Sequence, residues 1–443
     1  MRKHFLNKTH FSVLGMGRSG LAAARLLASF NKDVDAYDTR ELEIDLEGVN
    51  FHPSSNAISS KSEVLVASPG APPRSEVFEN LAATIVSEVE IGWEASNAKT
   101  IAITGTDGKT TTTELIHHLL KNARLSSVAC GNIGIPVSEV VLNGEHEYLV
   151  LEISAFQLWS THFFKPEVVV FTNIAEDHVD YFSDFSEYVA AKKRLMKNAT
   201  RSDVGVFNAS DPYVQSWAGT FPGRVFSYGL EKPDFGEMKM WVEEGTVFLE
   251  TPDAEGTIEF VKIADLNLIG DHNALNIMAA TLAFTALELD INQARLGLSS
   301  FEAPRHRLQK LGVHLGIQFY NDSKATNAHA AIAGLQNLPL GLTVIAGGLD
   351  KGLQLDAFCE LLTQRAKSVV LIGEIGNRLR DALIRAGHEN VHLCDSLLEA
   401  VDLAIEITEE GGVISLSPAC SSFDMFDSYA QRGEIFMDIV AAK

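Results

Sequence analysis

Short apolar runs alternate with helix-like stretches along the first hundred residues of the chain. Residues 11–14, 34–37 and 64–67 are apolar except for Ser12 and Asp35, and each run is followed by Gly, by Asp or by Ser-Pro-Gly. Between the first two runs, residues 21–28 have the apolar spacing of a helix. Short apolar strands separated by helices predict a parallel β-sheet, because helices cover both faces of such strands.

The same alternation occurs twice more, with a polar stretch at 231–257 that predicts antiparallel hairpins and a hinge at 301–304. The further strands are expected at residues 100–104, 148–153, 168–172, 342–346, 368–372 and 413–416. The chain has 443 residues, which is room for two to four domains of about 100–200 residues each.

We therefore expect an α/β protein of three domains. Residues 1–98 should form a Rossmann-like domain, and residues 99–302 a central P-loop ATPase-type domain with a mostly parallel sheet. Residues 303–443 should form a second Rossmann-like α/β domain. Each of these folds binds ligands at the carboxyl ends of its strands, so the functional residues should follow the strands.

Composition narrows the function classes. The formal net charge is −22, which disfavours broad binding of nucleic acid or of anionic membranes. Four scattered cysteines have no C-x-x-C spacing, so reduced thiols are expected. No apolar run approaches the ~20 residues of a membrane helix, and no secretory pattern is present. We expect a cytoplasmic monomer.

The strongest motif is a phosphate loop at residues 105–110, between a predicted strand and an amphipathic helix. Its glycines let backbone N–H groups face phosphate oxygens, and the following helix points its positive end at the same anion. Lys109 would lie over the β- and γ-phosphates, and the Thr110 hydroxyl would bind Mg²⁺. The first glycine of the usual motif is replaced by Ile103, so the loop is a shortened one.

A second glycine cluster lies near the N-terminus. Gly15, Gly17 and Gly20 fit G-x-G-x-x-G, and Asp38 ends the next strand about 20 residues on, as in a dinucleotide site. The pattern suits the pyrophosphate of NAD or that of UDP. Glycines that only allow close packing of helix and strand are the alternative.

Further motifs carry a resemblance to one family, the Mur ligases. They lie in the family's order at residues 105–111, 131–136, 152–158, 173–178, 190–192, 270–276, 306–307, 321–327 and 417–424. The segments Asn-Asp-Ser-Lys-Ala-Thr-Asn at 321–327 and Ser-Pro-Ala-Cys-Ser-Ser-Phe-Asp at 417–424 resemble the branch that adds D-glutamate. Together the motifs cover nearly the whole chain.

The resemblance implies a reaction and its cofactors. ATP would phosphorylate the carboxylate of UDP-N-acetylmuramoyl-L-alanine, and the amine of D-glutamate would attack the acyl phosphate. Two Mg²⁺ ions are implied, together with a carbamate formed from CO₂ on Lys192. Phosphoryl transfer asks a protein mainly for positioning and neutralisation of charge, and a carbamate needs a neutral amine, which burial favours.

The resemblance also assigns residues. The catalytic and metal-binding set is Lys109, Thr110, Glu152, His178 and Lys192. The ATP-binding set is Gly105, Thr106, Asp107, Gly108, Lys109, Thr110, Thr111, Asn273, Asn276, Arg307, Asp322 and Lys324. The UDP-substrate set is Gly17, Arg18, Ser19, Gly20, Asp38, Thr39, Arg40, Ser68, Pro69, Gly70, Asn132 and Gln157. The amino-acid set is Lys324, Thr326, Lys351, Ser422 and Phe423.

Some alternatives stay open. Lys192-Lys193-Arg194 also reads as a solvated helical face, and the choice of Lys192 over Lys193 rests on the Ala-Ala-Lys match. Asp107 and Ala155 stand where family members have Asn and Ser. Rival functions are a related ligase for another amino acid, a folylpolyglutamate-type enzyme, an NAD-dependent oxidoreductase and an inactive nucleotide-binding protein.

Overall fold

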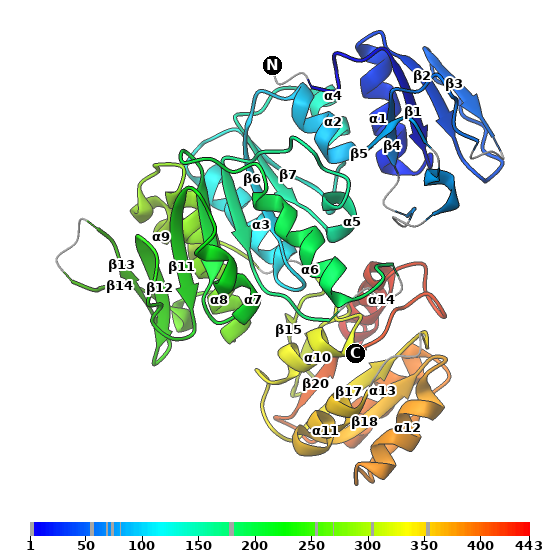
Figure 1. Cartoon of the computed structure of the whole chain (residues 1–443). Coiled ribbons are helices and arrows are strands. Elements are labelled where there is room, and N and C mark those ends of the chain that lie inside the picture. Colours follow the sequence, from blue (N-terminus) through cyan, green and yellow to red (C-terminus); the bar gives the residue numbers. More distant parts are fainter. Residues whose placement is uncertain are drawn as a thin grey trace. The chain divides into compact units, whose positions relative to one another are not determined.

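The computed structural model describes residues 4–53, 57–67, 70–71, 75–79, 81–176, 181–252, 256–268, 270–302, 305–350 and 355–443. The chain divides into two compact units. The first holds residues 1–267 and 273–301, and the second holds 268–272 and 302–443. Three β-sheets are present, two in the first unit and one in the second (Figure 1). The α/β fold class is therefore confirmed, while the boundaries at 98/99 and 302/303 stay predictions.

The first sheet is a parallel sheet of five strands in the order β3-β2-β1-β4-β5. Its strands are β1 His10–Leu14, β2 Asp33–Tyr37, β3 Val49–His52, β4 Val64–Ala67 and β5 Thr84–Ser87. Its helices are α1 Arg18–Ser29 and α2 Glu88–Ala95. The apolar runs form a core around Phe11, Leu27 and Val66, which confirms the first three predicted strands.

The central sheet has nine strands in the order β14-β13-β12-β11-β10-β9-β6-β8-β7. The strands are β6 Lys99–Thr104, β7 Ser127–Gly131, β8 Tyr148–Glu152, β9 Val168–Phe171, β10 Val204–Asn208, β11 Arg224–Gly229, β12 Met238–Glu243, β13 Thr246–Glu250 and β14 Ile258–Lys262. The helices are α3 Lys109–Asn122, α4 Val137–Asn143, α5 Ala155–Leu158, α6 Phe185–Lys193, α7 Pro212–Ala218, α8 Asp271–Thr285 and α9 Ile291–Leu298.

Strand direction in the central sheet follows the hydrophobic pattern. The strands β6 to β12 pair in parallel, and every residue of β8 is buried. The strands β12, β13 and β14 pair antiparallel, as the polar stretch predicted. Because β6 lies between β8 and β9, the carboxyl ends of these three strands meet at one edge of the sheet.

The third sheet lies in the second unit and has the order β15-β16-β20-β17-β18-β19. Its strands are β15 Gln309–His314, β16 Ile317–Asn321, β17 Leu342–Gly347, β18 Ala366–Ile372, β19 Val391–Leu393 and β20 Val413–Leu416. Only β15 pairs antiparallel among the described strands. The helices are α10 Ala328–Leu335, α11 Asp356–Arg365, α12 Gly376–Arg385, α13 Leu397–Ile407 and α14 Tyr429–Ala441.

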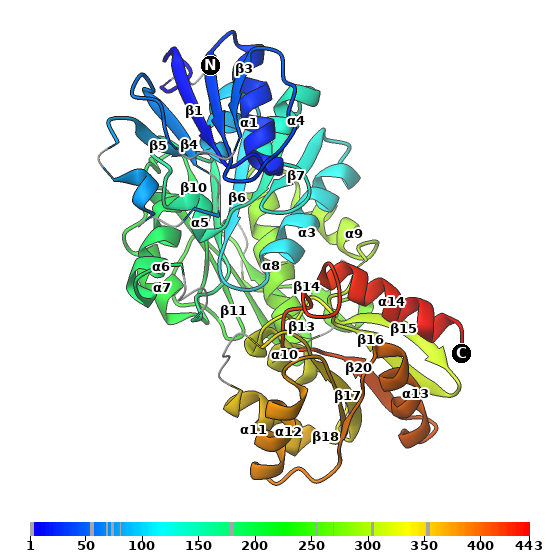
Figure 2. The same ribbon diagram turned by 90° about the vertical axis from the view of Figure 1, so that its right-hand side faces the viewer.

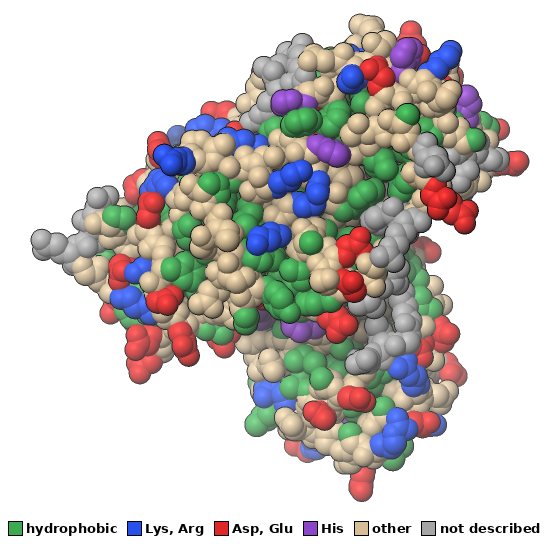
Figure 3. All heavy atoms as spheres, in the orientation of Figure 1, with side chains coloured by type: hydrophobic (Ala, Val, Ile, Leu, Met, Phe, Trp, Pro, Cys, Tyr) green, Lys and Arg blue, Asp and Glu red, His purple; other side chains and the backbone are tan. Residues whose placement is uncertain are grey.

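On the face drawn in Figure 3, acidic and basic side chains are interspersed. Among the described residues, no helix is both long and apolar enough to cross a bilayer. All four cysteines are buried free thiols.

Candidate active site

The phosphate loop joins the carboxyl end of β6 to the start of α3. Gly108 caps the helix in a left-handed conformation with φ +80°. This conformation suits glycine, because a side chain there is strained. The Lys109 ammonium donates to the Thr106 carbonyl at 2.6 Å, so the cation lies over the loop itself.

Glu152 lies at the end of β8, directly beside this loop. The Thr110 hydroxyl donates to one carboxylate oxygen at 2.6 Å, and the Asn132 side-chain amide donates to the other at 2.8 Å. Hydroxyl and carboxylate oxygens are the ligands that Mg²⁺ takes, with phosphate and water oxygens filling the remaining positions. The residues therefore fit a magnesium site.

Lys192 lies on α6 and is 2% exposed. Its ammonium donates to the Gly105 carbonyl at 2.5 Å and lies 4.6 Å from the centre of the Tyr188 ring. The Tyr188 hydroxyl in turn lies 3.0 Å from the Thr106 hydroxyl. The solvated-face interpretation is wrong for Lys192, because tertiary packing places it under the phosphate loop while Lys193 is half-buried.

Asn276 of α8 lies beside Gly108, where an added Cβ would collide with its side-chain oxygen. The Thr112 hydroxyl donates to Asn276 Oδ1 at 3.2 Å, and Asn276 Nδ2 donates to Asn273 Oδ1 at 3.2 Å. Both asparagine side chains are buried. The structure thus places Asn276 in contact with Thr112 and Asn273 in contact with Asn276.

The glycine loop after β1 allows α1 to pack closely on the strand, and it lies next to the carboxylate of Asp38. A Cβ on Gly20 would collide with the Gly15 carbonyl, so close contact of helix and strand requires this glycine. Asp38 accepts hydrogen bonds from the Met16 amide at 2.7 Å and from Arg40 Nη2 at 2.8 Å. The Arg40 guanidinium holds the pKa of Asp38 well below its usual range.

Two predicted substrate residues have contacts that sequence did not predict. The Arg18 guanidinium donates to the Gly134 carbonyl, in the loop that carries Asn132. The Gln157 side-chain oxygen accepts the Ser154 amide at 3.0 Å, in a capping box at the start of α5. Gln157 therefore has a structural role in this unit.

The second unit has its own polar cluster at the carboxyl ends of β16 and β20. Asp322 is buried and accepts the Leu308 amide at 3.0 Å, and burial raises its pKa to about 7. The Lys324 ammonium lies 3.8 Å from the centre of the Tyr429 ring. Ser422 is buried, whereas Phe423 is 65% exposed.

Arg432 on α14 donates hydrogen bonds to the segments that follow β16 and β20. It is fully buried, and its guanidinium donates to the Ser323 hydroxyl at 2.9 Å, the Ser323 carbonyl at 2.9 Å and the Cys420 carbonyl at 3.1 Å. A buried guanidinium is costly unless carbonyl or hydroxyl oxygens accept from it. Arg432 therefore fixes the loops that follow β16 and β20.

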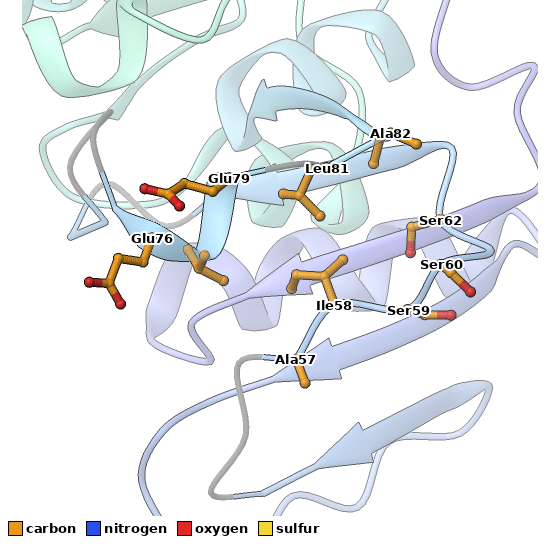
Figure 4. Close-up of a pocket in the computed structure, with 11 residues that line it drawn as sticks. Ala57, Ile58, Ser59, Ser60, Ser62, Glu76, Glu79, Leu81 and Ala82 are labelled. Carbon is orange, nitrogen blue, oxygen red and sulfur yellow. The ribbon is translucent and has the colours of Figure 1, made fainter.

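A cavity of about 510 Å³ opens beside the first sheet (Figure 4). Its lining includes Ser59, Ser62, Glu76 and Leu81, and it lies at the amino ends of β4 and β5. Parallel sheets bind ligands at the opposite edge, where the strands end. The cavity is separate from the candidate site.

Comparison with known proteins decides the family. The family model described as "Mur ligase middle domain" matches residues 103–284, and the model described as "Mur ligase, glutamate ligase domain" matches residues 306–420. A relative from Geotalea uraniireducens, named UDP-N-acetylmuramoylalanine–D-glutamate ligase, is 35% identical over 97% of this chain and 96% of its own. The chain belongs to the Mur ligase family. A relative with the same name from Halalkalibacterium halodurans is 34% identical to this Mur ligase, over 97% of each chain.

Solved structures show the same fold. A pseudomurein peptide ligase from Methanothermus fervidus aligns with the ligase at a TM-score of 0.62 and 19% identity, over 98% of this chain and 100% of that one. UDP-N-acetylmuramate-alanine ligase from Thermotoga maritima aligns at 0.61 and 18% identity, over 98% and 100%. These confirm the predicted three-domain α/β fold. The comparisons do not favour the oxidoreductase alternative.

Several predicted site residues of the ligase lie outside the described part of the chain: Ser68, Pro69, His178 and Lys351. Sequence reasoning missed Tyr188, Tyr429 and Arg432. None of the three lies in a glycine-rich loop or at a strand end, the places that the motifs of the sequence mark. The one available signal is an arginine on an otherwise amphipathic final helix, and most such arginines are exposed.

Proposed function

We propose that this Mur ligase uses ATP to join D-glutamate to UDP-N-acetylmuramoyl-L-alanine in peptidoglycan precursor synthesis. Relatives of nearly the same length, all named for that activity, support the substrate pair. The observation that carries the proposal is the hydrogen bond from Thr110 to Glu152, because it joins the phosphate loop to a carboxylate at the strand edge. A ligase that activates a carboxylate with ATP needs this combination.

The chemistry begins with transfer of the γ-phosphoryl group to the substrate's terminal carboxylate. The amine of D-glutamate then attacks the acyl phosphate, and the tetrahedral intermediate collapses to an amide with loss of phosphate. The chain's part is to hold the groups in line and to neutralise charge. Lys109 lies over the loop and would neutralise negative charge on the phosphates.

The proposal includes two Mg²⁺ ions near the phosphate loop. Thr110 and Glu152 would hold one Mg²⁺, which would neutralise charge on the phosphates. Lys192, as a carbamate, would join His178 at a second Mg²⁺. The position of Lys192 supports this, because it is 2% exposed and its side-chain nitrogen contacts the Gly105 carbonyl of the phosphate loop. Lys193 is only half-buried and is a poorer candidate.

The resemblance also assigns residues of the second unit to the ligands. Arg307, Asp322 and Lys324 are assigned to ATP, and Thr326, Lys351, Ser422 and Phe423 to the amino acid, together with Lys324. Support comes from the grouping of Asp322 and Lys324 at one strand end. A monomeric state and a cytoplasmic location stay predictions.

The test is release of phosphate from ATP by the purified chain. We expect turnover only when Mg²⁺, UDP-N-acetylmuramoyl-L-alanine and D-glutamate are all present. Control reactions replace D-glutamate with L-glutamate or a diamino acid. Turnover with one of those instead would contradict the amino-acid assignment, and turnover without any UDP-linked substrate would contradict the ligase assignment itself.

A further inference from the structure

Helix α2 carries three buried glutamates where the chain passes from the first sheet to the central sheet. Glu88, Glu90 and Glu94 are all 3% exposed or less. A buried carboxylate is costly unless N–H groups donate to it. Each of the three carboxylates accepts hydrogen bonds from backbone amides of a different segment. Helix α2 therefore contacts three separate segments of the first unit.

Two of these attachments lie away from the phosphate loop. Glu90 accepts the His162 amide at 2.7 Å and the Phe164 amide at 2.8 Å. Glu94 accepts the Leu6 amide at 3.0 Å, together with other amides of the N-terminal segment. These contacts stabilise the fold without touching the site.

Glu88 has a different partner. It accepts the Ser138 amide at 2.6 Å, in the first turn of α4, where backbone N–H groups have no partner within the helix. One turn along α2, a Cβ on Gly92 would lie 2.8 Å from the Ser138 nitrogen. The two helices therefore meet backbone to backbone, and α4 has little freedom to shift while Glu88 holds it. Figure 2 shows α4 beside α1 in the same unit.

The start of α4 is continuous with the loop that carries Asn132. The Gly131 amide donates to the Ile135 carbonyl at 2.9 Å, which closes the loop into a compact turn. The Asn132 amide donates to the Glu152 carbonyl at 2.8 Å, and its side chain donates to the Glu152 carboxylate at 2.8 Å. A shift of α4 would therefore move Asn132 relative to the carboxylate.

We propose that Glu88 is a positioning residue for the reaction, acting through α4 and Asn132 on the carboxylate of Glu152. The inference rests on the proposed function, in which Glu152 binds the metal. Glu88 itself is 3% exposed and lies on a helix of the first sheet, so it does not touch substrate. Its effect is on geometry, and a displacement of about 1 Å far from the chemistry can cost on the order of a hundredfold in rate.

The test compares Glu88→Ala and Glu88→Gln with Glu94→Ala. The last is the matched control, since it removes a buried carboxylate from the same helix without touching α4. In metal-free protein, we expect Glu88→Ala to raise amide hydrogen exchange at residues 131–138 and Glu94→Ala to leave it unchanged there. Glu88→Gln keeps an oxygen acceptor for Ser138 and should retain wild-type protection.

Kinetics supply the second readout. Glu88→Ala should raise the Mg²⁺ concentration needed for half-maximal phosphate release and lower kcat roughly 10- to 100-fold, because a displaced Asn132 would no longer hold the Glu152 carboxylate in place. Glu88→Gln should keep the wild-type kcat and the wild-type Mg²⁺ dependence. In an Asn132→Ala background, Glu88→Ala should have little further effect, because the two act in one chain of contacts.

The outcomes separate this inference from the proposed function. If wild type has no D-glutamate-dependent turnover, the proposed function fails, and exchange at 131–138 still reports on Glu88. Equal exchange in Glu88→Ala and Glu94→Ala would overturn the role of Glu88. The role of Glu88 would also be overturned if the double variant lowered kcat by the product of the two single effects, since that result would mean that Glu88 and Asn132 act independently. If Glu88→Ala does not fold, Glu88→Asp, whose shorter side chain draws the carboxylate back from the Ser138 amide, is compared with Glu94→Asp and combined with Asn132→Ala in the same way.

Discussion

Replacement of Gly108 by alanine tests the phosphate loop at its most constrained position. Gly108 caps α3 with φ +80°, a left-handed conformation. A Cβ at this position would collide with Asn276 Oδ1. Asn276 would have to turn away, and its hydrogen bonds to Thr112 and Asn273, each 3.2 Å, would be lost.

The magnitude follows from these contacts. A non-glycine residue in the left-handed region costs about 1–2 kcal/mol. Each of the two lost hydrogen bonds contributes about 0.5–1.5 kcal/mol. The expected loss in the free energy of unfolding of the first unit is therefore about 2–5 kcal/mol. The same collision would move the phosphate loop and Asn276, both assigned to ATP, so we expect ATP binding to weaken by roughly tenfold, which corresponds to about 1.4 kcal/mol of binding free energy.

Urea unfolding and calorimetric titration with Mg²⁺ and ATP measure the two effects. The matched control is Gly219→Ala. Gly219 caps α7 with φ −66°, and nothing lies within 4 Å of the added Cβ. The control should stay within about 0.5 kcal/mol of wild type. If Gly108→Ala unfolds at the same urea concentration as the control and binds ATP equally well, the loop does not need its left-handed turn.

Three further predictions address other parts of the site. Lys192→Ala should lose turnover, and added short-chain carboxylates should restore part of it by replacing the carbamate; full turnover without them would remove Lys192 from the site. Burial raises the pKa of Asp322 from 3.8 to about 7, so the folded state holds this proton more tightly than the unfolded chain. Its stabilising contribution is full below about pH 4 and lost as pH rises through about 7. Urea unfolding at pH 5 and pH 8 should therefore show a smaller decline in Asp322→Asn than in wild type, and equal declines would contradict a raised pKa. Arg432→Met should lower the free energy of unfolding of the second unit by at least about 1–3 kcal/mol, because buried carbonyls lose their donor, and should raise KM for D-glutamate; an unchanged KM at lower stability would limit Arg432 to the fold.

Much of the site could be located from local pattern alone. The phosphate loop was found because Gly108, Lys109 and Thr110 are neighbours between a strand and a helix, and their function depends on that local geometry. Glu152 could be placed because it ends a predicted strand, whereas Asp322 was assigned by the resemblance alone. The Mur ligase resemblance then gave each of them a role, since the motifs lie in one order along the chain.

Other features could not be seen in this way. Lys192-Lys193-Arg194 has the composition of an exposed helical face, yet Lys192 is buried because α6 packs under the loop. Tyr188 and Arg432 act through contacts with segments 82 and 109 residues away. No local pattern encodes such contacts.

The sequence by itself determined where strands, turns and helix starts fall, because backbone preferences and apolar periodicity act over a few residues. It also determined the family, because the motifs recur in order. Only the tertiary structure decided which of these segments meet. Thr110 and Glu152 are neighbours because β6 and β8 pair in parallel, and Glu88 reaches α4 because two helices touch backbone to backbone. Such pairings depend on the packing of the whole unit, and that packing is set by contacts distant in the chain.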